Sequence, residues 1–351
     1  MQRPLILLTG LLGCGSSPLA DCREGHERGR EGHCHPVGPD ADAETPAPDS
    51  GDFHPEDTQD TGLPPRDDTI VRLVAGIQHT CALQGDGRVT CWGRPDLIAS
   101  TPNFRVKDLT AQGWHSCVVD LEDHLYCWGD NSLGQASFPT TGSYAKVSAG
   151  TTHTCAITTD GEITCWGVPD DHPDFAHGQV SDAPSGNDHV AISSGKLHSC
   201  AQRADRTLVC WGPDDGGSVL LHGDSVDVNQ VRGVTDMPVA QLMTYYWGTC
   251  WLDESGQADC CGALMGSEYF QVPTDTFKVI EGGGLHSCGI RADDTLRCWG
   301  DDQHEQVSTT PSGTFSVIGP GEKHTCAVRT SGEVVCWGRN QFGEGTPPPS
   351  L

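Results

Sequence analysis

Short segments of alternating apolar and polar residues follow one another from residue 70 almost to the end of the chain, and a polar turn separates each pair of segments. Alternation with a period of two predicts β-strands with one face toward a core, and clusters of Gly, Asp, Ser and Thr predict turns. A clear unit of this kind reads HTCALQGDGRVTCWG at residues 79–93. Because no long segment has the 3.6-residue apolar period of an amphipathic helix, we expect an all-β protein.

The same unit occurs seven times, which predicts a repeat architecture. Its first Cys stands at positions 81, 117, 155, 200, 250, 288 and 326, and a second Cys follows ten residues later in every copy. The steps between copies are 36, 38, 45, 50, 38 and 38 residues. The extra residues before the fourth and fifth copies must lie in connections, because the units themselves keep their length.

The ten-residue spacing predicts a disulfide inside each hairpin. A three-residue turn centred on Asp86, with Gly87 at positive φ, would place Cys81 directly opposite Cys91. Opposed residues of antiparallel strands are close enough for a disulfide. Nearly all positions two residues inside each Cys are apolar, so one hairpin face carries Cys and aliphatic side chains and the other carries Trp92 or its equivalent. The expected pairs are Cys81–Cys91, Cys117–Cys127, Cys155–Cys165, Cys200–Cys210, Cys250–Cys260, Cys288–Cys298 and Cys326–Cys336.

Two other interpretations of the unit remain open from sequence alone. The His two residues before the first Cys could join both sulfurs as a zinc ligand. The fifth copy keeps its Cys pair but has Gly248 in place of His, so the pair does not require the imidazole. The six His residues could also be general bases, but a residue repeated in nearly every unit favours a structural role. We expect no metal, no cofactor and no catalytic residue.

Composition and charge agree with an exported protein. The 351 residues include 18 Cys, and disulfides persist in oxidising compartments. The formal net charge is −27, from 21 Lys and Arg against 48 Asp and Glu. Because that charge would repel a phosphate backbone, nucleic acid is excluded as a partner.

The first 69 residues predict an anchor and a tether. Residues 1–13 have Arg3, a short apolar run and LLG before Cys14, which resembles a bacterial lipobox with an acylated Cys14. A plain signal peptide with an incidental Cys is the alternative. Residues 14–69 are rich in Asp, Pro, Thr and Gly and predict an extended acidic tether. Within it we favour a Cys22–Cys34 disulfide closing a small loop over a Cys/His metal site.

The repeats resemble those of the regulator of chromosome condensation family. The matching segments are VAG at 74–76, HT at 79–80, WG at 92–93, NSLGQ at 131–135 and NQFG at 340–343, and the likeness covers residues 70–349. It implies a seven-bladed β-propeller. The fifth unit departs from the pattern, because Gly248 and Cys261 replace its His and Trp. The presence of a Cys pair in each unit is also unlike the intracellular members of the family.

Four aromatic residues follow the longer insertion in the fifth unit. Trp251 or Trp247 could fill the space of the missing Trp. We also expect Tyr245, Tyr246 and Trp247 to form an exposed recognition patch, because Tyr and Trp are enriched in binding hot spots.

Since the chain has no nucleotide-binding, zinc-protease or serine-hydrolase motif, a binding function is the primary expectation. We expect a monomeric scaffold for a protein or polysaccharide at a bacterial cell envelope, lipid-anchored in the outer membrane or at the surface, or otherwise secreted. The membrane is reached through the lipid alone. The alternative is a carbohydrate-active enzyme, a lyase or glycosidase, with acidic residues on the loops between blades.

Overall fold

The computed structural model describes residues 26–28, 34–36, 66–172, 175, 178–212, 239–246, 248–262 and 272–351. The chain divides into two compact units, Met1–Leu63 and Pro64–Leu351. In the first unit, β1 (His26–Arg28) pairs antiparallel with β2 (Cys34–Pro36). Cys14 and Cys22 lie outside the described residues, so the lipid anchor and the Cys22–Cys34 disulfide stay predictions.

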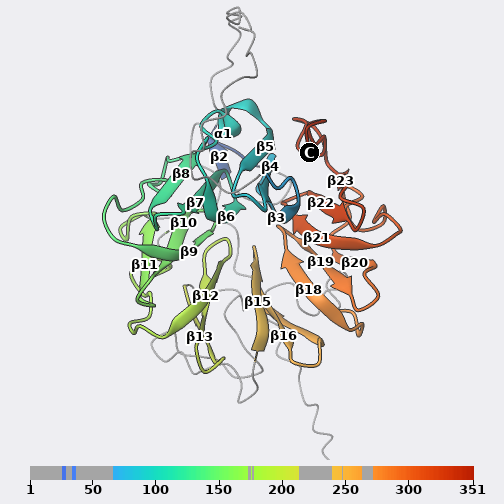
Figure 1. Cartoon of the computed structure of the whole chain (residues 1–351). Coiled ribbons are helices and arrows are strands. Elements are labelled where there is room, and N and C mark those ends of the chain that lie inside the picture. The colour runs from blue at the N-terminus through green and yellow to red at the C-terminus, as the bar shows by residue number, and fades with distance from the viewer. Residues whose placement is uncertain are drawn as a thin grey trace, which may run out of the picture. The chain divides into compact units, whose positions relative to one another are not determined.

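The second unit is a ring of seven three-stranded antiparallel sheets, the blades of a β-propeller (Figure 1). In each blade the strands lie in chain order, and the first strands of neighbouring blades line the centre of the ring. The only helix of the described residues, α1 (Pro95–Ile98), follows the first blade. The blades are β3 (Ile70–Ala75), β4 (His79–Gln84) and β5 (Val89–Gly93); β6 (Val106–Gln112), β7 (His115–Asp120) and β8 (Leu125–Gly129); β9 (Tyr144–Ala149), β10 (His153–Thr158) and β11 (Ile163–Gly167); β12 (His189–Ser194), β13 (Ser199–Arg203) and β14 (Leu208–Trp211); β15 (Val239–Tyr245), β16 (Gly248–Asp253) and β17 (Ala258–Gly262); β18 (Phe277–Gly282), β19 (His286–Arg291) and β20 (Leu296–Gly300); and β21 (Phe315–Pro320), β22 (His324–Arg329) and β23 (Val334–Gly338).

The hairpin between the second and third strands of each blade has the predicted register. Cys81 lies opposite Cys91, and the same pairing recurs in the other six blades. Each pair forms a disulfide with a Cα–Cα distance of 4.0 or 4.1 Å. The third turn residue has a positive φ of 69–94° in all seven copies, whether it is a glycine such as Gly87 or a residue such as Asp123. Seven blades with one disulfide each are therefore confirmed.

The hydrophobic core is divided among the seven interfaces between blades. At each interface, the face of one blade that carries Cys and aliphatic residues packs against the next blade. Between the first two blades, for example, Cys81 and Leu83 pack against Leu109, Val118 and Trp128. Equivalent clusters occupy the other six interfaces of the described ring. The disulfide sulfurs thus belong to the core, which explains how a chain poor in aliphatic residues builds one.

Candidate functional site

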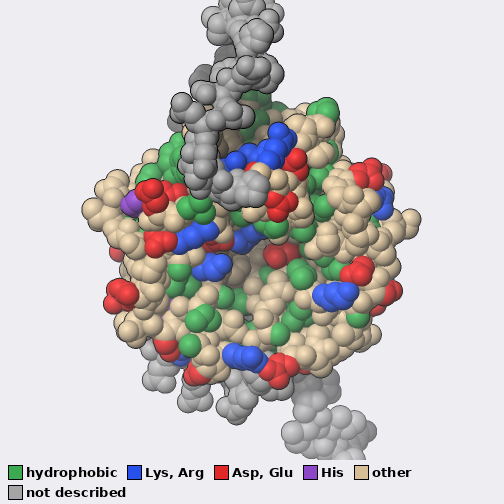
Figure 2. Space-filling view, in the orientation of Figure 1, with side chains coloured by type: hydrophobic (Ala, Val, Ile, Leu, Met, Phe, Trp, Pro, Cys, Tyr) green, Lys and Arg blue, Asp and Glu red, His purple; other side chains and the backbone are tan. Residues whose placement is uncertain are grey.

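The axis of the propeller is a channel lined by the inner strands of all seven blades. It encloses a cavity of about 250 Å³, and Figure 2 shows one end of it as a hollow at the centre of the ring. One residue of each blade lies in its wall directly opposite the first Cys of that blade. We call these seven residues the channel ring: Val74, Thr110, Ser148, Ser193, Met243, Glu281 and Gly319.

Hydroxyl groups of the channel ring connect neighbouring inner strands. Thr110 Oγ1 accepts a hydrogen bond from the backbone N–H of Ala149 in the next blade, at 3.1 Å. Ser148 accepts in the same way from Ser194 at 2.9 Å. Because inner strands of adjacent blades belong to different sheets, a short polar side chain supplies the acceptor that a strand of the same sheet would otherwise provide. The channel wall is therefore polar and held by side chains.

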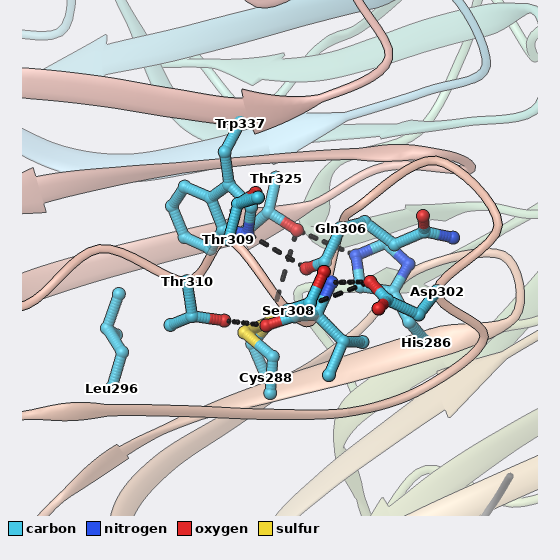
Figure 3. Close-up of a disulfide and its surroundings, with 12 residues drawn as sticks. His286, Cys288, Leu296, Asp302, Gln306, Ser308, Thr309, Thr310, Thr325 and Trp337 are labelled. Atoms are coloured by element: carbon cyan, nitrogen blue, oxygen red, sulfur yellow. Dashed lines mark hydrogen bonds between the residues drawn. A yellow bond between two sulfur atoms is a disulfide. The ribbon is translucent and has the colours of Figure 1, made fainter.

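Each of the six repeat imidazoles joins its own blade to the next one. His79 Nε2 lies 2.7 Å from Ser116 Oγ of the following blade, and His324 Nε2 lies 2.8 Å from Thr80 Oγ1, which closes the ring. Figure 3 shows the equivalent contact between the sixth and seventh blades, where His286 faces Thr325 at 2.7 Å beside the disulfide of Cys288. The other three contacts, at 2.7–3.0 Å, are His115–Thr154, His153–Ser199 and His198–Thr249.

Burial keeps these imidazoles neutral. It lowers the pKa of His79, His198 and His286 from 6.5 to about 4, and that of the other three to about 3. Thr80 donates its hydroxyl proton to the backbone oxygen of Glu344 at 3.0 Å, so the imidazole of His324 must donate to Thr80. The imidazole of His324 is therefore a neutral donor between blades, and all six imidazoles are fully buried, which favours a structural role over one as general base.

In four blades, the loop that follows the third strand accepts a hydrogen bond from the next blade through one backbone carbonyl oxygen. The oxygen of Gln135 accepts from the Trp166 indole at 3.0 Å. Glu344 O accepts from the Trp92 indole at 2.9 Å, so the last described loop holds the first blade. In the other two contacts, the backbone oxygens of Gln179 and Gln306 accept from the indoles of Trp211 and Trp337. Figure 3 draws the second of these.

The fifth blade differs from the other blades at two pairs of positions. In five blades a glycine three positions before the His leaves room for the imidazole, because a Cβ at Gly76 would lie 2.3 Å from His79 Cε1. In the fifth blade the glycine is Gly248 itself, and the fully buried Tyr245 lies opposite it. Ser287, which would receive the missing imidazole, has a buried Oγ with no hydrogen-bond partner among the described residues.

The second difference concerns the missing Trp. Trp251 takes the position that is Ala82 in the first blade, and it packs with Leu208 and Val239 at the interface that the absent indole would occupy. This burial supports the interpretation that Trp251 fills that space. The large side chain has moved to the neighbouring strand of the same blade face.

The prediction that Tyr245 and Tyr246 are exposed in a recognition patch is wrong. Tyr245 is fully buried in the core between the fifth and sixth blades, and Tyr246 is 8% exposed and lines the channel. Tyr245 is buried because it fills the space beside Gly248. Trp247 lies outside the described residues, so its role stays a prediction.

A different aromatic group lies at the surface, where loops of three blades meet. The Arg94 guanidinium lies 5.5 Å from the Trp114 ring centre and 5.7 Å from that of Phe342. Phe342 is 37% exposed, and Trp114 is partly exposed. Arg94 also pairs with Asp96 at 2.7 Å. We call Arg94, Trp114 and Phe342 the aromatic clamp. Sequence reasoning missed it because the three residues come from loops of the first, second and seventh blades.

No group of three or more His, Cys, Asp or Glu residues in the described parts of the chain is arranged to hold a metal ion. The thiols considered as zinc ligands instead form the seven disulfides.

Known proteins share these repeats and this fold. The regulator of chromosome condensation (RCC1) repeat matches residues 70–96, 106–135, 144–172, 277–306 and 321–344. RCC1 domain-containing protein 1 of Homo sapiens is 28% identical over 85 residues, 20% of this chain and 23% of the relative. The ultraviolet-B receptor UVR8 of Arabidopsis thaliana is 29% identical over 129 residues, 28% of this chain and 29% of the receptor. The matches thus span less than a third of these relatives.

Solved structures agree on the architecture. The ectodomain of the receptor kinase ACR4 of Arabidopsis thaliana superposes with a TM-score of 0.63 at 20% identity, covering 81% of this chain and 99% of that one. Prp20p of Saccharomyces cerevisiae, studied for its binding to Gsp1p and histones, superposes with a TM-score of 0.54 at 16% identity, covering 72% and 80%. The chain folds as a seven-bladed β-propeller and carries regulator of chromosome condensation (RCC1) repeats.

Proposed function

We propose that this propeller is a non-catalytic binding scaffold that recognises a protein or polysaccharide at the cell envelope. The observation that carries the proposal is the aromatic clamp. Arg and Trp are among the side chains most enriched in binding hot spots, and here they meet at the surface on a ring of rigid blades. The repeat imidazoles support the same conclusion, because their hydrogen bonds join blades.

The similar proteins support a binding role for this fold. Prp20p has been studied for its binding to proteins, and ACR4 presents its propeller as an ectodomain. These likenesses concern the fold that presents the binding surface. The net charge of −27 opposes nucleic acid as that partner.

Attachment through acylated Cys14 would place the propeller at the envelope. No helix among the described residues is long and apolar enough to cross a membrane. A single lipid with a polar tether would leave the propeller free to reach its partner. Replacing Cys14 with Ser should move the protein from the membrane to the soluble fraction. Sedimentation of both forms with membranes, with no acyl chain on the wild type, would contradict the anchor.

Affinity capture tests the binding surface. The full chain carrying Cys14→Ser serves as bait for envelope proteins and envelope polysaccharides. We expect Trp114→Ala to lose most of the captured partner, because truncating a hot-spot residue costs at least about 2 kcal/mol, roughly thirtyfold in affinity. Val190→Ala is the matched control, since Val190 is 50% exposed on the fourth blade. Equal capture by both variants would exclude the aromatic clamp, and cleavage of an envelope polysaccharide would favour the enzyme alternative.

A further inference from the structure

Glu281 is the one ionisable side chain of the channel ring. Its carboxylate borders the 250 Å³ cavity, and its six ring companions are apolar, hydroxyl-bearing or glycine. Among the residues that the structure describes, none forms a hydrogen bond or ion pair with the Glu281 side chain, which is half-buried in the channel wall. A carboxylate in the middle of a protein normally has such partners.

The missing partner has a cause in the next blade. Thr110, Ser148 and Ser193 each accept a hydrogen bond from the backbone N–H that follows the ring position of the next blade. The equivalent residue facing Glu281 is Pro320, which has no N–H. Glu281 therefore lies where the neighbouring blade would be expected to supply a backbone N–H donor, and no described residue supplies one.

The charges around the cavity leave Glu281 uncompensated. Among the described residues, Arg72 is the only Lys or Arg in the wall, and its guanidinium is paired with the buried Asp108. Glu322 lies at one end of the channel and pairs with Arg339 at 3.7 Å and Lys323 at 3.9 Å. Burial raises the pKa of Glu281 to about 7, and the charge of Arg72 opposes that rise only in part. Above pH 7 the free site thus holds a carboxylate that a cation with N–H donors would stabilise.

We propose that the central channel binds a small organic ammonium ion whose N–H groups donate to the Glu281 carboxylate. The cavity has the volume of about eight water molecules, which suits a compact ligand of that class. The hydroxyl groups of Thr110 and Ser148 line the same wall and add acceptors. A divalent cation fits less well, because Ca²⁺ takes six to eight oxygen ligands and the ring offers one carboxylate. This site is independent of the aromatic clamp.

Calorimetry with the full chain carrying Cys14→Ser tests the proposal with butylammonium as the probe. Butanol, which has no charge, and tetramethylammonium, which has no N–H, are the control ligands. We expect butylammonium to bind at least tenfold more tightly than either. Its affinity should fall about tenfold between pH 8 and pH 6, because a carboxylate with a pKa near 7 is mostly protonated at pH 6.

Two variants make the test specific to Glu281. Glu281→Gln should weaken butylammonium binding at least tenfold and remove its dependence on pH. Glu333→Gln, at an exposed carboxylate in the last hairpin turn, should change neither. Pro320→Ala restores an N–H opposite Glu281 and should weaken binding while the fold is kept, as circular dichroism will show. Undetectable binding to the wild-type propeller at 10 mM butylammonium, or equal binding by Glu281→Gln, would overturn the proposal.

Discussion

The six buried imidazoles should make the propeller sensitive to acid. Each has a native pKa of about 3 or 4 and an unfolded value of 6.5, so below pH 6.5 the unfolded chain binds more protons than the native one. Stability therefore falls as the pH falls from 6.5 toward 4. The free energy of unfolding that the six neutral imidazoles contribute is fully present only above pH 6.5.

The magnitude follows from the width of that interval. At pH 5 each imidazole is 1.5 pH units below its unfolded pKa, which lowers the free energy of unfolding by about 2 kcal/mol, or about 12 kcal/mol for six. Glu281 acts in the opposite direction, because its native pKa is raised, and it offsets roughly 3 kcal/mol between pH 7 and pH 5. A net loss of about 9 kcal/mol is comparable to the whole stability of a typical domain.

Guanidinium denaturation at pH 7.5 and pH 5, with the disulfides intact, measures this loss, and NMR titration of the imidazole resonances identifies its source. We expect six resonances to stay in the neutral form down to the pH at which the protein unfolds. Equal stability at the two pH values, or titration of all imidazoles near pH 6.5 in the native state, would refute the reasoning. Either result would mean that protons reach the imidazoles between the blades without unfolding.

Three further predictions concern the frame of the ring. Glu344 is fully buried and pairs with Arg339 at 3.1 Å, at positions where two other blades pair Gln with Asp. Glu344→Gln alone should therefore lower the free energy of unfolding by about 1–3 kcal/mol in chemical denaturation. Adding Arg339→Asp should recover much of that loss. Gly248→His should lower the melting temperature because Tyr245 fills that space, whereas Gly248→His with Tyr245→Gly should restore it and give Ser287 a partner. Non-reducing peptide mapping should place each of the seven disulfides within one blade, each contributing about 2.7 kcal/mol by loop entropy, and links between blades would contradict this.

Local features of the blades were predictable because they depend on contacts ten residues apart. The position of Asp86 at the centre of a turn was enough to place Cys81 opposite Cys91, and the structure has that register in every blade. Alternation along the same strands predicted the two faces, which meet at the blade interfaces. A hairpin carries its register in its own turn, so no distant residue is needed to specify it.

Contacts between blades were not predictable from these patterns. The sequence predicts that Tyr245 is exposed. Only its position opposite Gly248 shows that it is buried in the space that an imidazole fills in other blades. A weak signal for the channel ring does exist, because each ring residue stands seven positions before a first Cys. That signal did not reveal which side chains lack a partner, since Glu281 meets Pro320 from the next blade.

The sequence by itself determined the repeat, the turn, the Cys pairing inside each blade and the number of blades. The tertiary structure decided the rest: the closing contact of Glu344 with Trp92, the aromatic clamp and the surroundings of Glu281. The physical reason is separation along the chain. A disulfide in a hairpin joins residues 10 apart, whereas Trp92 and Glu344 are 252 apart and meet because seven blades complete one turn around the channel.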